Sequence, residues 1–599
     1  RIAQISKRRG GGGIDISPIR PKGMYTRNSA FTTDGIVVFM ERFSNTSREV
    51  AQAGRRGALM ESISVHHPEV MNFIKAKRNL DKITGANISV RVTDEFMKAV
   101  KRNKKYEQRW PVDSDNPQVK QMVNAKEIWD EIIKSVYLSA EPGVLFWDTI
   151  IRNSPADSYD SLGFKTCGTN PCGELPLNPS DSCRLMSINL TSCVDNPFTK
   201  DSKFNEEKYI EIIHKSMRLM DDLIEMEIKA VENIIKKVKS DPENNLVKEN
   251  ELNMWEDIRN NCERGRRTGL GVTGLADCIA MLNHKYGDKS SIKIVENIYR
   301  ILRDEAYRTS IELAKERGPF PIWDHNLEKD NEFLSRLPDD IRRNMKKYGR
   351  RNIACLTTAP SGTISIVAQT SSGFEPVFKT EYIRKRKLNE NDNEDPDFID
   401  TMGDRWKEYK IYHHGLLKYK DITGKDFEDS PYNGAQAEEI DYNIRVKMQA
   451  IATKYVCHAI SSTVNLPQDI DFDIVEDLYT KAWEEGCKGL TVYRAGSREG
   501  VLSSSGSKKD CPECDQSSEK FKEAIESEKL LEIVPSIAPD RPSLMECDIH
   551  RSRVGGGDWL FFVGLLNGRP YEVFGGDSEQ FTIPHKYKNG LIAKNGKVD

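Results

Sequence analysis

An excess of charge of either sign is missing from this chain of 599 residues, in which 89 lysine and arginine residues stand against 92 aspartate and glutamate residues. This balance gives no electrostatic case for binding a nucleic acid or an anionic membrane surface. Long apolar runs are missing too, because none approaches the roughly 18 residues that a membrane-spanning helix needs. Nothing at the N-terminus has the pattern of a signal peptide. We therefore expect a cytoplasmic protein that binds neither nucleic acid nor membrane.

The chain has too few cysteines for disulfide bonds to hold a protein of this length together. Its 12 cysteines are expected to be free or redox-active thiols in a reducing compartment. None precedes Cys167. Cys511 and Cys514 form a single C-x-x-C pair, and only Cys547 and His550 lie near enough in sequence to complete the four ligands of a structural zinc site. We therefore favour a pair without metal over a zinc site.

Turn and linker signals divide the chain into three parts. No low-complexity linker precedes about residue 501, so residues 1–500 can form one large α/β unit. Residues 501–540 are predicted to be a linker, and residues 541–599 a small β region with a hairpin around Asn567-Gly568. Within the large unit, apolar residues keep helical spacing from Asn205 to Lys239. This pattern predicts one long helix or two kinked ones, packed on the core of the unit rather than on a second subunit.

A possible reactive centre lies between residues 169 and 190. Asn170, Cys172 and Glu174 alternate, so an extended segment would place an amide, a thiol and a carboxyl on one side. Cys183 follows just before a predicted strand over 185–190. The two thiols could simply be small buried hydrophobes. Against this, a carboxylate beside a buried thiol is costly unless it is paired or used, and burial would raise its pKa toward that of a general base.

A second candidate site is a loop that follows a predicted strand over 352–357. The loop opens into a helix, where free backbone N–H groups and three hydroxyls would form an anion site without a lysine. The alternative is an ordinary capped helix behind a proline turn. The loop residues in question are Ser361, Gly362, Thr363, Ile364 and Ser365.

Two glycine-rich stretches allow more than one interpretation. The run from Gly10 to Gly13 is either a flexible turn or a backbone that a nucleotide approaches closely. Gly269, Gly271 and Gly274 match the spacing of a dinucleotide-binding fingerprint. That fold also needs a second strand with an acidic residue about 20 positions on, and none follows. Close packing of a helix is therefore the favoured explanation for these three glycines.

The segments NPCGELPL and SCRLMSINL resemble the active-site region of ribonucleotide reductases, most closely the adenosylcobalamin-dependent class II branch. APSGTIS followed by SSGFEP agrees with that branch, as do the predicted strands at 463–467 and 489–494. The resemblance covers residues 8–500. It implies a ten-stranded α/β barrel made of two parallel half-barrels, followed here by a small β appendage.

The resemblance also implies roles for individual residues in reducing ribonucleotides to 2′-deoxyribonucleotides. Cys172 would become a thiyl radical and take hydrogen from C3′ of the ribose. Glu174 would accept the proton of the 3′-hydroxyl, and Asn170 would hydrogen-bond the sugar. Cys183 would supply one of two reducing thiols.

Nucleotide-binding residues follow by the same resemblance. Gly11 would border the substrate, and the loop 361–365 would hold its phosphates. Arg20 would lie in the first specificity loop, which responds to a dNTP or ATP effector. The second such loop would contain Gln52, Arg55 and Arg56, and a solvated turn is the less favoured alternative for its two arginines.

The resemblance names a cofactor and partners. Class I catalytic subunits carry adjacent tyrosines that relay a radical from another subunit, and no Tyr-Tyr pair occurs in this sequence. We therefore expect adenosylcobalamin as cofactor and a thioredoxin-like reductant. The family places the partner of Cys183 on a first strand that would precede Arg1, so we expect a complementing N-terminal chain, and a homodimer is conceivable. Two alternatives stay open: a class I large subunit that needs a metal-radical partner, and an inactive nucleotide-binding fragment.

Overall fold

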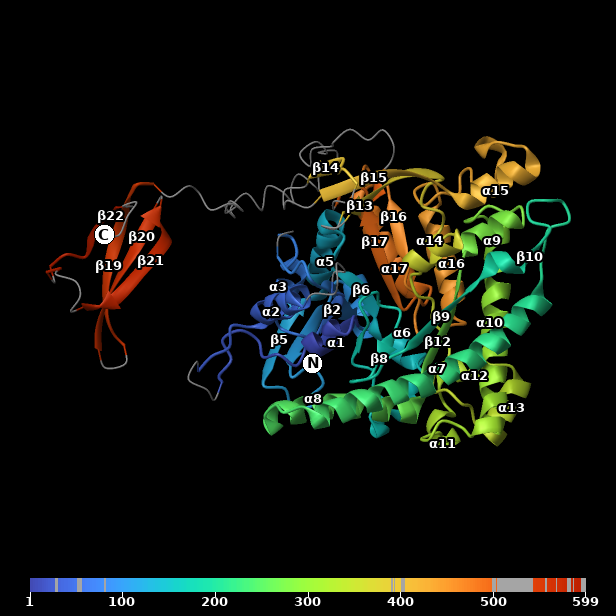
Figure 1. Cartoon of the computed structure of the whole chain (residues 1–599), viewed down its shortest axis with the longest axis horizontal. Coiled ribbons are helices and arrows are strands. Elements are labelled where there is room, and N and C mark those ends of the chain that lie inside the picture. Colours follow the sequence, from blue (N-terminus) through green and yellow to red (C-terminus); the bar gives the residue numbers. More distant parts are fainter. Residues whose placement is uncertain are drawn as a thin grey trace. The chain divides into compact units, whose positions relative to one another are not determined.

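The computed structural model describes residues 1–26, 31–50, 57–79, 82–388, 392, 394–399, 405–497, 502–503, 542–554, 557–566, 568–578, 583–584 and 586–593. The chain forms two compact units, Arg1–Ser518 and Glu519–Asp599 (Figure 1). Their boundary falls within the predicted linker. Cys511 and Cys514 lie outside the described residues.

The largest sheet of the first unit has six strands in the order β1-β2-β3-β6-β17-β16. Four of them run parallel to one another, namely β1 (Gly12–Asp15), β2 (Leu59–Ser64), β3 (Asn87–Val92) and β6 (Gly143–Phe146). β17 (Gly489–Arg494) is antiparallel to β6 and parallel to β16 (Thr463–Leu466). Two parallel groups of opposite direction therefore meet at the β6–β17 pair.

Helices cover the first parallel group, which explains why β2, β3 and β6 are buried along nearly their whole length rather than at alternate positions. The side chains of β2 are buried at five consecutive positions, Leu59 to Ile63. One apolar cluster joins these strands to the helices around them. The helices are α2 (Ile36–Glu49), α3 (Val70–Lys75), α4 (Asp94–Lys101), α5 (Ala125–Ser139) and α17 (Phe472–Glu484).

A second pair of parallel strands belongs to the other half of the unit. β9 (Arg184–Asn189) pairs with β12 (Thr268–Thr273), as the apolar run at 185–190 predicts. Single parallel bridges continue the layer from Leu270 to Leu356 and from Thr358 to Ile460. The pairing observed is an α/β architecture rich in parallel strands, and closure into a ten-stranded barrel is not established by it.

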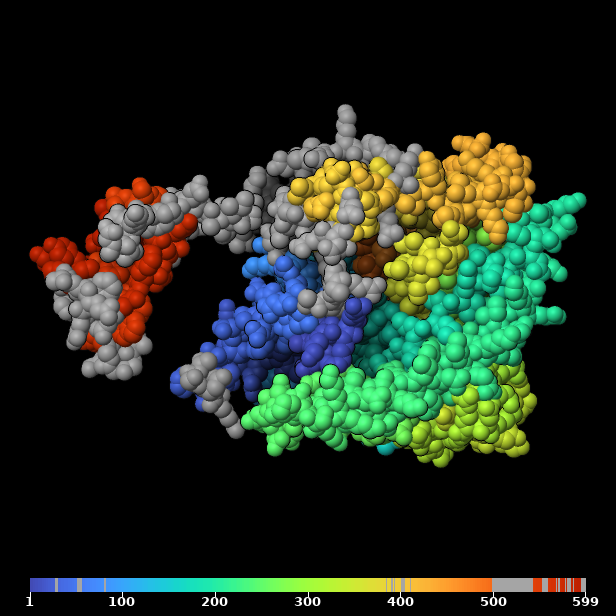
Figure 2. Space-filling model, viewed as in Figure 1, coloured from blue at the N-terminus to red at the C-terminus, as the bar shows by residue number. Residues whose placement is uncertain are grey.

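Long helices pack on this second half. The predicted helix over 205–239 is a single helix, α7 (Glu206–Ser240), whose buried residues recur at helical spacing. It packs against α8 (Asn245–Gly265) and α10 (Lys289–Arg317). Figure 2 shows α8 along the surface of the unit, in green. Packing within the unit therefore accounts for the apolar face of α7.

The glycines of 269–274 have a different role from the predicted one. Gly269 and Gly271 lie within β12, and Gly274 precedes α9 (Leu275–Met281). A Cβ atom at Gly271 would lie 2.3 Å from the carbonyl oxygen of Thr357. Close approach of neighbouring strands, not close packing of a helix, therefore requires glycine at 269 and 271, and the prediction was wrong.

The remaining elements of the first unit are shorter or peripheral. The helices are α1 (Ile2–Lys7), α6 (Trp147–Arg152), η1 (Ala156–Leu162), η2 (Leu190–Cys193), α11 (His325–Glu328), α12 (Glu332–Ser335), α13 (Asp339–Tyr348), α14 (Gly362–Ala368), α15 (His414–Thr423), η3 (Phe427–Asp429) and α16 (Tyr442–Thr453). The strands are β4 (Lys105–Trp110), β5 (Val119–Asn124), β7 (Gly168–Thr169), β8 (Pro176–Leu177), β10 (Val194–Asp195), β11 (Lys203–Phe204), β13 (Glu381–Lys387), β14 (Phe398–Ile399), β15 (Arg405–Tyr412) and β18 (Leu502–Ser503). Among the described helices, none is both long and apolar enough to cross a membrane.

The second unit is an antiparallel sheet in the order β21-β20-β19-β22. Its strands are β19 (Leu544–Val554), β20 (Gly557–Leu566), β21 (Arg569–Asp577) and β22 (Asn589–Ala593). The predicted hairpin is the β20–β21 pair. Gly568 has a φ of +74°, as the second central residue of a type I′ turn requires, while Asn567 lies outside the described residues.

Candidate active site

Asn170, Cys172 and Glu174 lie on a tight turn between β7 and β8. The Asn170 N–H donates to the Leu175 carbonyl at 3.2 Å, and the Gly173 N–H donates to the Asn170 carbonyl at 3.1 Å. The side-chain oxygen of Asn170 accepts from the Leu175 N–H at 3.0 Å. Gly173 has a φ of +81°, which an extended strand does not contain. The prediction that an extended segment aligns the three side chains was therefore wrong, although the turn does keep them together.

The turn exposes the thiol and buries the carboxyl. Cys172 is exposed, so it is not a buried hydrophobe. Glu174 is 2% exposed, and its Oε2 has no hydrogen-bond partner among the described residues. Burial raises the pKa of the Glu174 carboxyl, an effect that its hydrogen bonds only partly offset. Desolvation and the neighbouring Glu174 carboxyl raise the pKa of Cys172 to about 11, so the thiol is protonated at neutral pH.

Gly13 in β1 and Gly11, which precedes the strand, let the backbone approach this turn. A Cβ atom at Gly13 would lie 1.7 Å from the carbonyl oxygen of Thr169, and one at Gly11 would lie 3.1 Å from the ring of Pro171. The side chain of Asn87 also donates to the Pro171 carbonyl at 3.0 Å. The structure therefore brings Gly11 beside the Cys172 turn, and a substrate contact at Gly11 stays a prediction.

Cys183 lies just before β9, with its sulfur next to β12. A Cβ atom at Gly269 would be 2.7 Å from the Cys183 Sγ and 2.9 Å from the methyl group of Thr357. Burial raises the pKa of the Cys183 thiol, while the nearby Arg267 and Arg184 lower it in part. The Thr357 hydroxyl donates to the Glu174 carbonyl at 3.0 Å. Thr357 thus lies between the Glu174 backbone and the sulfur of Cys183.

The loop 361–365 begins α14 without a side-chain cap. The Ser361 hydroxyl lies 2.7 Å from that of Thr273 and accepts from the Gly373 N–H at 2.8 Å. It makes no cap hydrogen bond, so the capped-helix alternative does not describe this loop. The Ser365 hydroxyl donates to the Gly362 carbonyl at 2.9 Å. Two of the three hydroxyls expected to meet an anion are thus already bonded within the protein, and a Cβ at Gly362 would meet nothing within 4 Å.

The effector residues are only partly described. The guanidinium of Arg20 lies over the ring of Trp110 at 5.9 Å. Gln52, Arg55 and Arg56 lie outside the described residues. Within the described part of the chain, no group of three or more His, Cys, Asp or Glu side chains could hold a metal ion.

Several residues near the site escaped the sequence analysis. Thr357 and the buried Arg267 bond segments that are far apart in sequence, so no local pattern marks them. The sulfur of Cys457 accepts from the N–H groups of Cys355 and Leu356 at 3.3 and 3.1 Å. The one available signal was a charged Arg267 directly before a strand that is buried throughout.

Comparison with known proteins identifies families that match both units of the chain. The family described as "Ribonucleotide reductase, barrel domain" matches residues 1–493, and the one described as "NrdJ homologue C-terminal domain" matches residues 545–599. A vitamin B12-dependent ribonucleoside-diphosphate reductase of Thermoplasma acidophilum is 32% identical over 506 residues, 83% of this chain and 59% of the relative. One of Mycobacterium tuberculosis (strain CDC 1551) is 30% identical over 517 residues, 85% of this chain and 67% of the relative.

A relative of another kind is the ribonucleoside-diphosphate reductase large subunit of Plasmodium falciparum, 25% identical over 542 residues, which are 82% of this chain and 62% of the relative. The chain spans between 57% and 67% of the length of the vitamin B12-dependent relatives of Thermoplasma acidophilum, Mycobacterium tuberculosis and Rhodopirellula baltica. Its match to the barrel family covers well over half of its own length. The chain therefore belongs to the ribonucleotide reductase barrel-domain family.

Proposed function

We propose that this chain reduces ribonucleotides to 2′-deoxyribonucleotides by a thiyl-radical mechanism that depends on adenosylcobalamin. The observation that carries the proposal is the Cys172 turn, where an exposed, protonated thiol stands two residues from a buried carboxyl. The Thermoplasma and Mycobacterium relatives are vitamin B12-dependent ribonucleoside-diphosphate reductases by name, which supports both the activity and a diphosphate substrate.

Each side chain of the turn suits one step. Cys172 acts as the radical residue, because its raised pKa keeps the S–H hydrogen in place at neutral pH. Glu174 accepts the proton of the 3′-hydroxyl, and its raised pKa makes it a better base than an ordinary carboxylate. Asn170 binds the sugar through its amide N–H₂ group, because its amide oxygen is already bonded to the Leu175 N–H. Cys183 supplies one reducing thiol.

The residues present fit adenosylcobalamin as the radical source. When bound, this cofactor supplies a carbon-centred radical by homolysis of its cobalt–carbon bond. Cys172 is the residue that would meet the cofactor, because it is the exposed residue of the turn 170–174.

The nucleotide is bound by backbone more than by side chains. The uncapped N–H groups that begin α14 and the open space at Gly362 suit the substrate phosphates. Thr363 is the hydroxyl of this loop that stays exposed. Gly11 borders the substrate beside the Cys172 turn, and Arg20 belongs to the loop that responds to a dNTP or ATP effector.

We also propose partners for this chain: a complementing N-terminal segment, a reductant and a second copy of the chain. Among the described residues, β1 pairs with β2 alone and β9 pairs with β12 alone. A ten-stranded barrel places one more strand between these two edges, which supports a complementing N-terminal segment that carries the partner of Cys183. A thioredoxin-like reductant would regenerate that thiol pair, and the proposed enzyme is a homodimer in the cytoplasm.

Turnover tests the proposal against the second candidate, a class I large subunit. That candidate is favoured by the relative from Plasmodium falciparum, whose name is that of a large subunit. The full chain, mixed with the upstream segment of its own source, is assayed for deoxynucleotide with and without adenosylcobalamin. Activity that requires adenosylcobalamin supports the proposal. Activity that instead requires a second, metal-containing protein contradicts it and supports the class I assignment.

A further inference from the structure

Arg267 holds the loop that leads to Cys183. Its Nε donates to Asp181 Oδ2 at 2.8 Å, and its Nη2 donates to Asn178 Oδ1 at 2.8 Å. The side chains of Arg267 and Asp181 are each 1% exposed. Breaking a buried ion pair of this kind leaves an uncompensated charge, so the contact resists opening. The backbone just before Cys183 is therefore fixed at two points by one guanidinium.

Arg267 is itself held from a third segment. Its Nη1 donates to the Nε2 of His458 at 3.1 Å, and the other ring nitrogen of His458 lies 2.8 Å from the Leu356 carbonyl. Burial and the positive charge of Arg267 lower the pKa of His458, so the ring is neutral. A neutral ring with its proton on Nδ1 satisfies both contacts at once. The guanidinium thus has a defined position before it bonds the loop.

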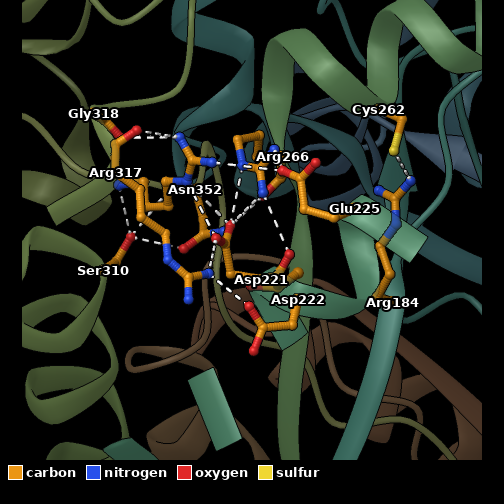
Figure 3. A network of polar contacts seen from close by, with 12 residues as sticks. Arg184, Asp221, Asp222, Glu225, Cys262, Arg266, Ser310, Arg317, Gly318 and Asn352 are labelled. Atoms are coloured by element: carbon orange, nitrogen blue, oxygen red, sulfur yellow. Dashed lines mark hydrogen bonds and ion pairs between the residues drawn. The ribbon is translucent and has the colours of Figure 1, made fainter. Parts of the chain in front are cut away.

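The backbone after Cys183 is held by contacts of Arg184 with α7 and α8. Arg184 donates from its Nε to Glu227 of α7 at 2.6 Å, and from its Nη1 to the Arg267 carbonyl at 3.3 Å. Its Nη2 reaches the sulfur of Cys262 on α8, as Figure 3 shows. Two buried arginines therefore hold the chain on either side of Cys183: Arg267 holds the segment before it, and Arg184 holds the segment after it.

The sulfur of Cys183 has its place because Gly269 has no side chain. The 2.7 Å between a Cβ atom at Gly269 and the Cys183 Sγ is shorter than a non-bonded contact allows. The methyl group of Thr357 and the side chain of Leu185 close the same space, at 2.9 and 3.0 Å from that Cβ position. Any residue other than glycine at 269 would compete with the sulfur for this space.

We propose that Arg267 and Gly269 are the positioning residues of Cys183. Arg267 fixes the backbone before the thiol, and Gly269 leaves the space in which the sulfur lies. This inference rests on the proposed function, in which Cys183 must meet one atom of the nucleotide. A displacement of about 1 Å is enough to slow such a step strongly. Neither residue touches the nucleotide in this account.

The test is the rate at which iodoacetamide alkylates Cys183 in the folded full-length chain, read by mass spectrometry. Cys278 in α9 is fully buried and reports global opening in the same sample. Arg267→Lys keeps the charge but loses the forked contacts, and Gly269→Ala adds the competing Cβ. The matched controls are Arg264→Lys, at a surface arginine that bonds the Leu162 carbonyl, and Gly12→Ala, whose Cβ would meet nothing within 4 Å.

Both Arg267→Lys and Gly269→Ala are expected to speed alkylation of Cys183 by about tenfold. This corresponds to a free energy of local opening that is lower by about 1.4 kcal/mol. The rate at Cys278 and both control variants should stay at the wild-type value. Adding Asp181→Glu to Arg267→Lys lengthens the carboxylate partner by one methylene, so that it can reach the shorter lysine. This second substitution should restore slow alkylation of Cys183. A Cys183 rate that stays at the wild-type value in both variants would overturn the proposal.

A rise at Cys183 that Cys278 matches would overturn it as well, since it would mean general loss of stability. If Arg267→Lys does not fold, Gly269→Ala alone decides between these outcomes. Alkylation needs neither nucleotide nor cofactor. A Cys183→Ser variant that keeps wild-type reductase activity in the complemented assay would therefore refute the redox role of Cys183 and leave the positioning result unchanged.

Discussion

The hydroxyl group of Thr357 lies 3.0 Å from the main-chain carbonyl oxygen of Glu174 and donates to it. The carbonyl oxygen of Ala459 is a second acceptor, also at 3.0 Å. The methyl group of the same threonine closes the space that holds the sulfur of Cys183. One buried side chain therefore bonds the backbone of the proposed base and, beside Gly269, borders the space that holds the proposed reducing thiol.

Thr357→Val should destabilise the folded chain by about 1 kcal/mol, because valine fills the same space but cannot donate to either carbonyl. Urea unfolding measures the change. Thr363→Val is the matched control, since the Thr363 side chain is exposed, and it should leave the free energy of unfolding within about 0.5 kcal/mol of the wild type. Equal midpoints for Thr357→Val and the wild type would show that the bridge contributes nothing.

Thr363→Ala should weaken nucleotide binding by about 1 kcal/mol, which is typical for one lost hydrogen bond. Ser365→Ala should have a smaller effect, because its hydroxyl already donates to the Gly362 carbonyl. Calorimetry with a ribonucleoside diphosphate measures both. If neither substitution changes the affinity, the start of α14 does not bind the phosphates through side chains.

The sequence could predict elements whose signals are local. The apolar spacing of 205–239 predicts α7, and the run at 185–190 predicts β9. The alternation at 170–174 indicated an extended segment, but the positive φ of Gly173 turns the chain there. Alternation of side chains along the sequence does not by itself identify an extended strand, because a glycine within it can turn the chain.

Contacts between distant segments were beyond prediction. Thr357 is 183 residues from Glu174, and Arg267 is 86 residues from Asp181. Neither pair leaves a pattern in the sequence, because each depends on strands brought together by the fold. The role of Gly269 was missed for the same reason, since its neighbours across the sheet were unknown.

Glu61 on β2 should make stability depend on pH. Burial, reinforced by Glu141 and opposed by Lys77, raises its pKa from 4.5 to about 8. The folded chain keeps this proton to higher pH than the unfolded chain does, so stability should fall as pH rises from 4.5 to 8. Glu61→Gln replaces the titrating carboxyl with a neutral amide. This change should stabilise the chain by up to about 3 kcal/mol at pH 7 relative to the wild type.

Urea unfolding at pH 5 and pH 8 compares the two proteins. The gain from Glu61→Gln should be small at pH 5 and large at pH 8. Glu95→Gln, at an exposed position on α4, is the control and should follow the wild type at both values. A gain of equal size at pH 5 and pH 8 would contradict the raised pKa of Glu61.

Cys172→Ser should leave nucleotide affinity within about twofold of the wild type, because serine occupies similar space on an exposed turn. It should nevertheless abolish radical formation, since a hydroxyl does not give up its hydrogen atom as a thiol does. Calorimetry measures the affinity. A large loss of binding would assign Cys172 to nucleotide recognition instead.

Exchange of hydrogen between the cofactor and water tests the central claim most directly. The full chain is incubated with an effector nucleotide and adenosylcobalamin that carries deuterium on its 5′-carbon, and loss of the label is followed by mass spectrometry. A thiol that repeatedly gives and regains its hydrogen releases the label to water, so the wild type should lose it and Cys172→Ser should keep it. Loss of the label at the wild-type rate in Cys172→Ser would contradict Cys172 as the radical residue.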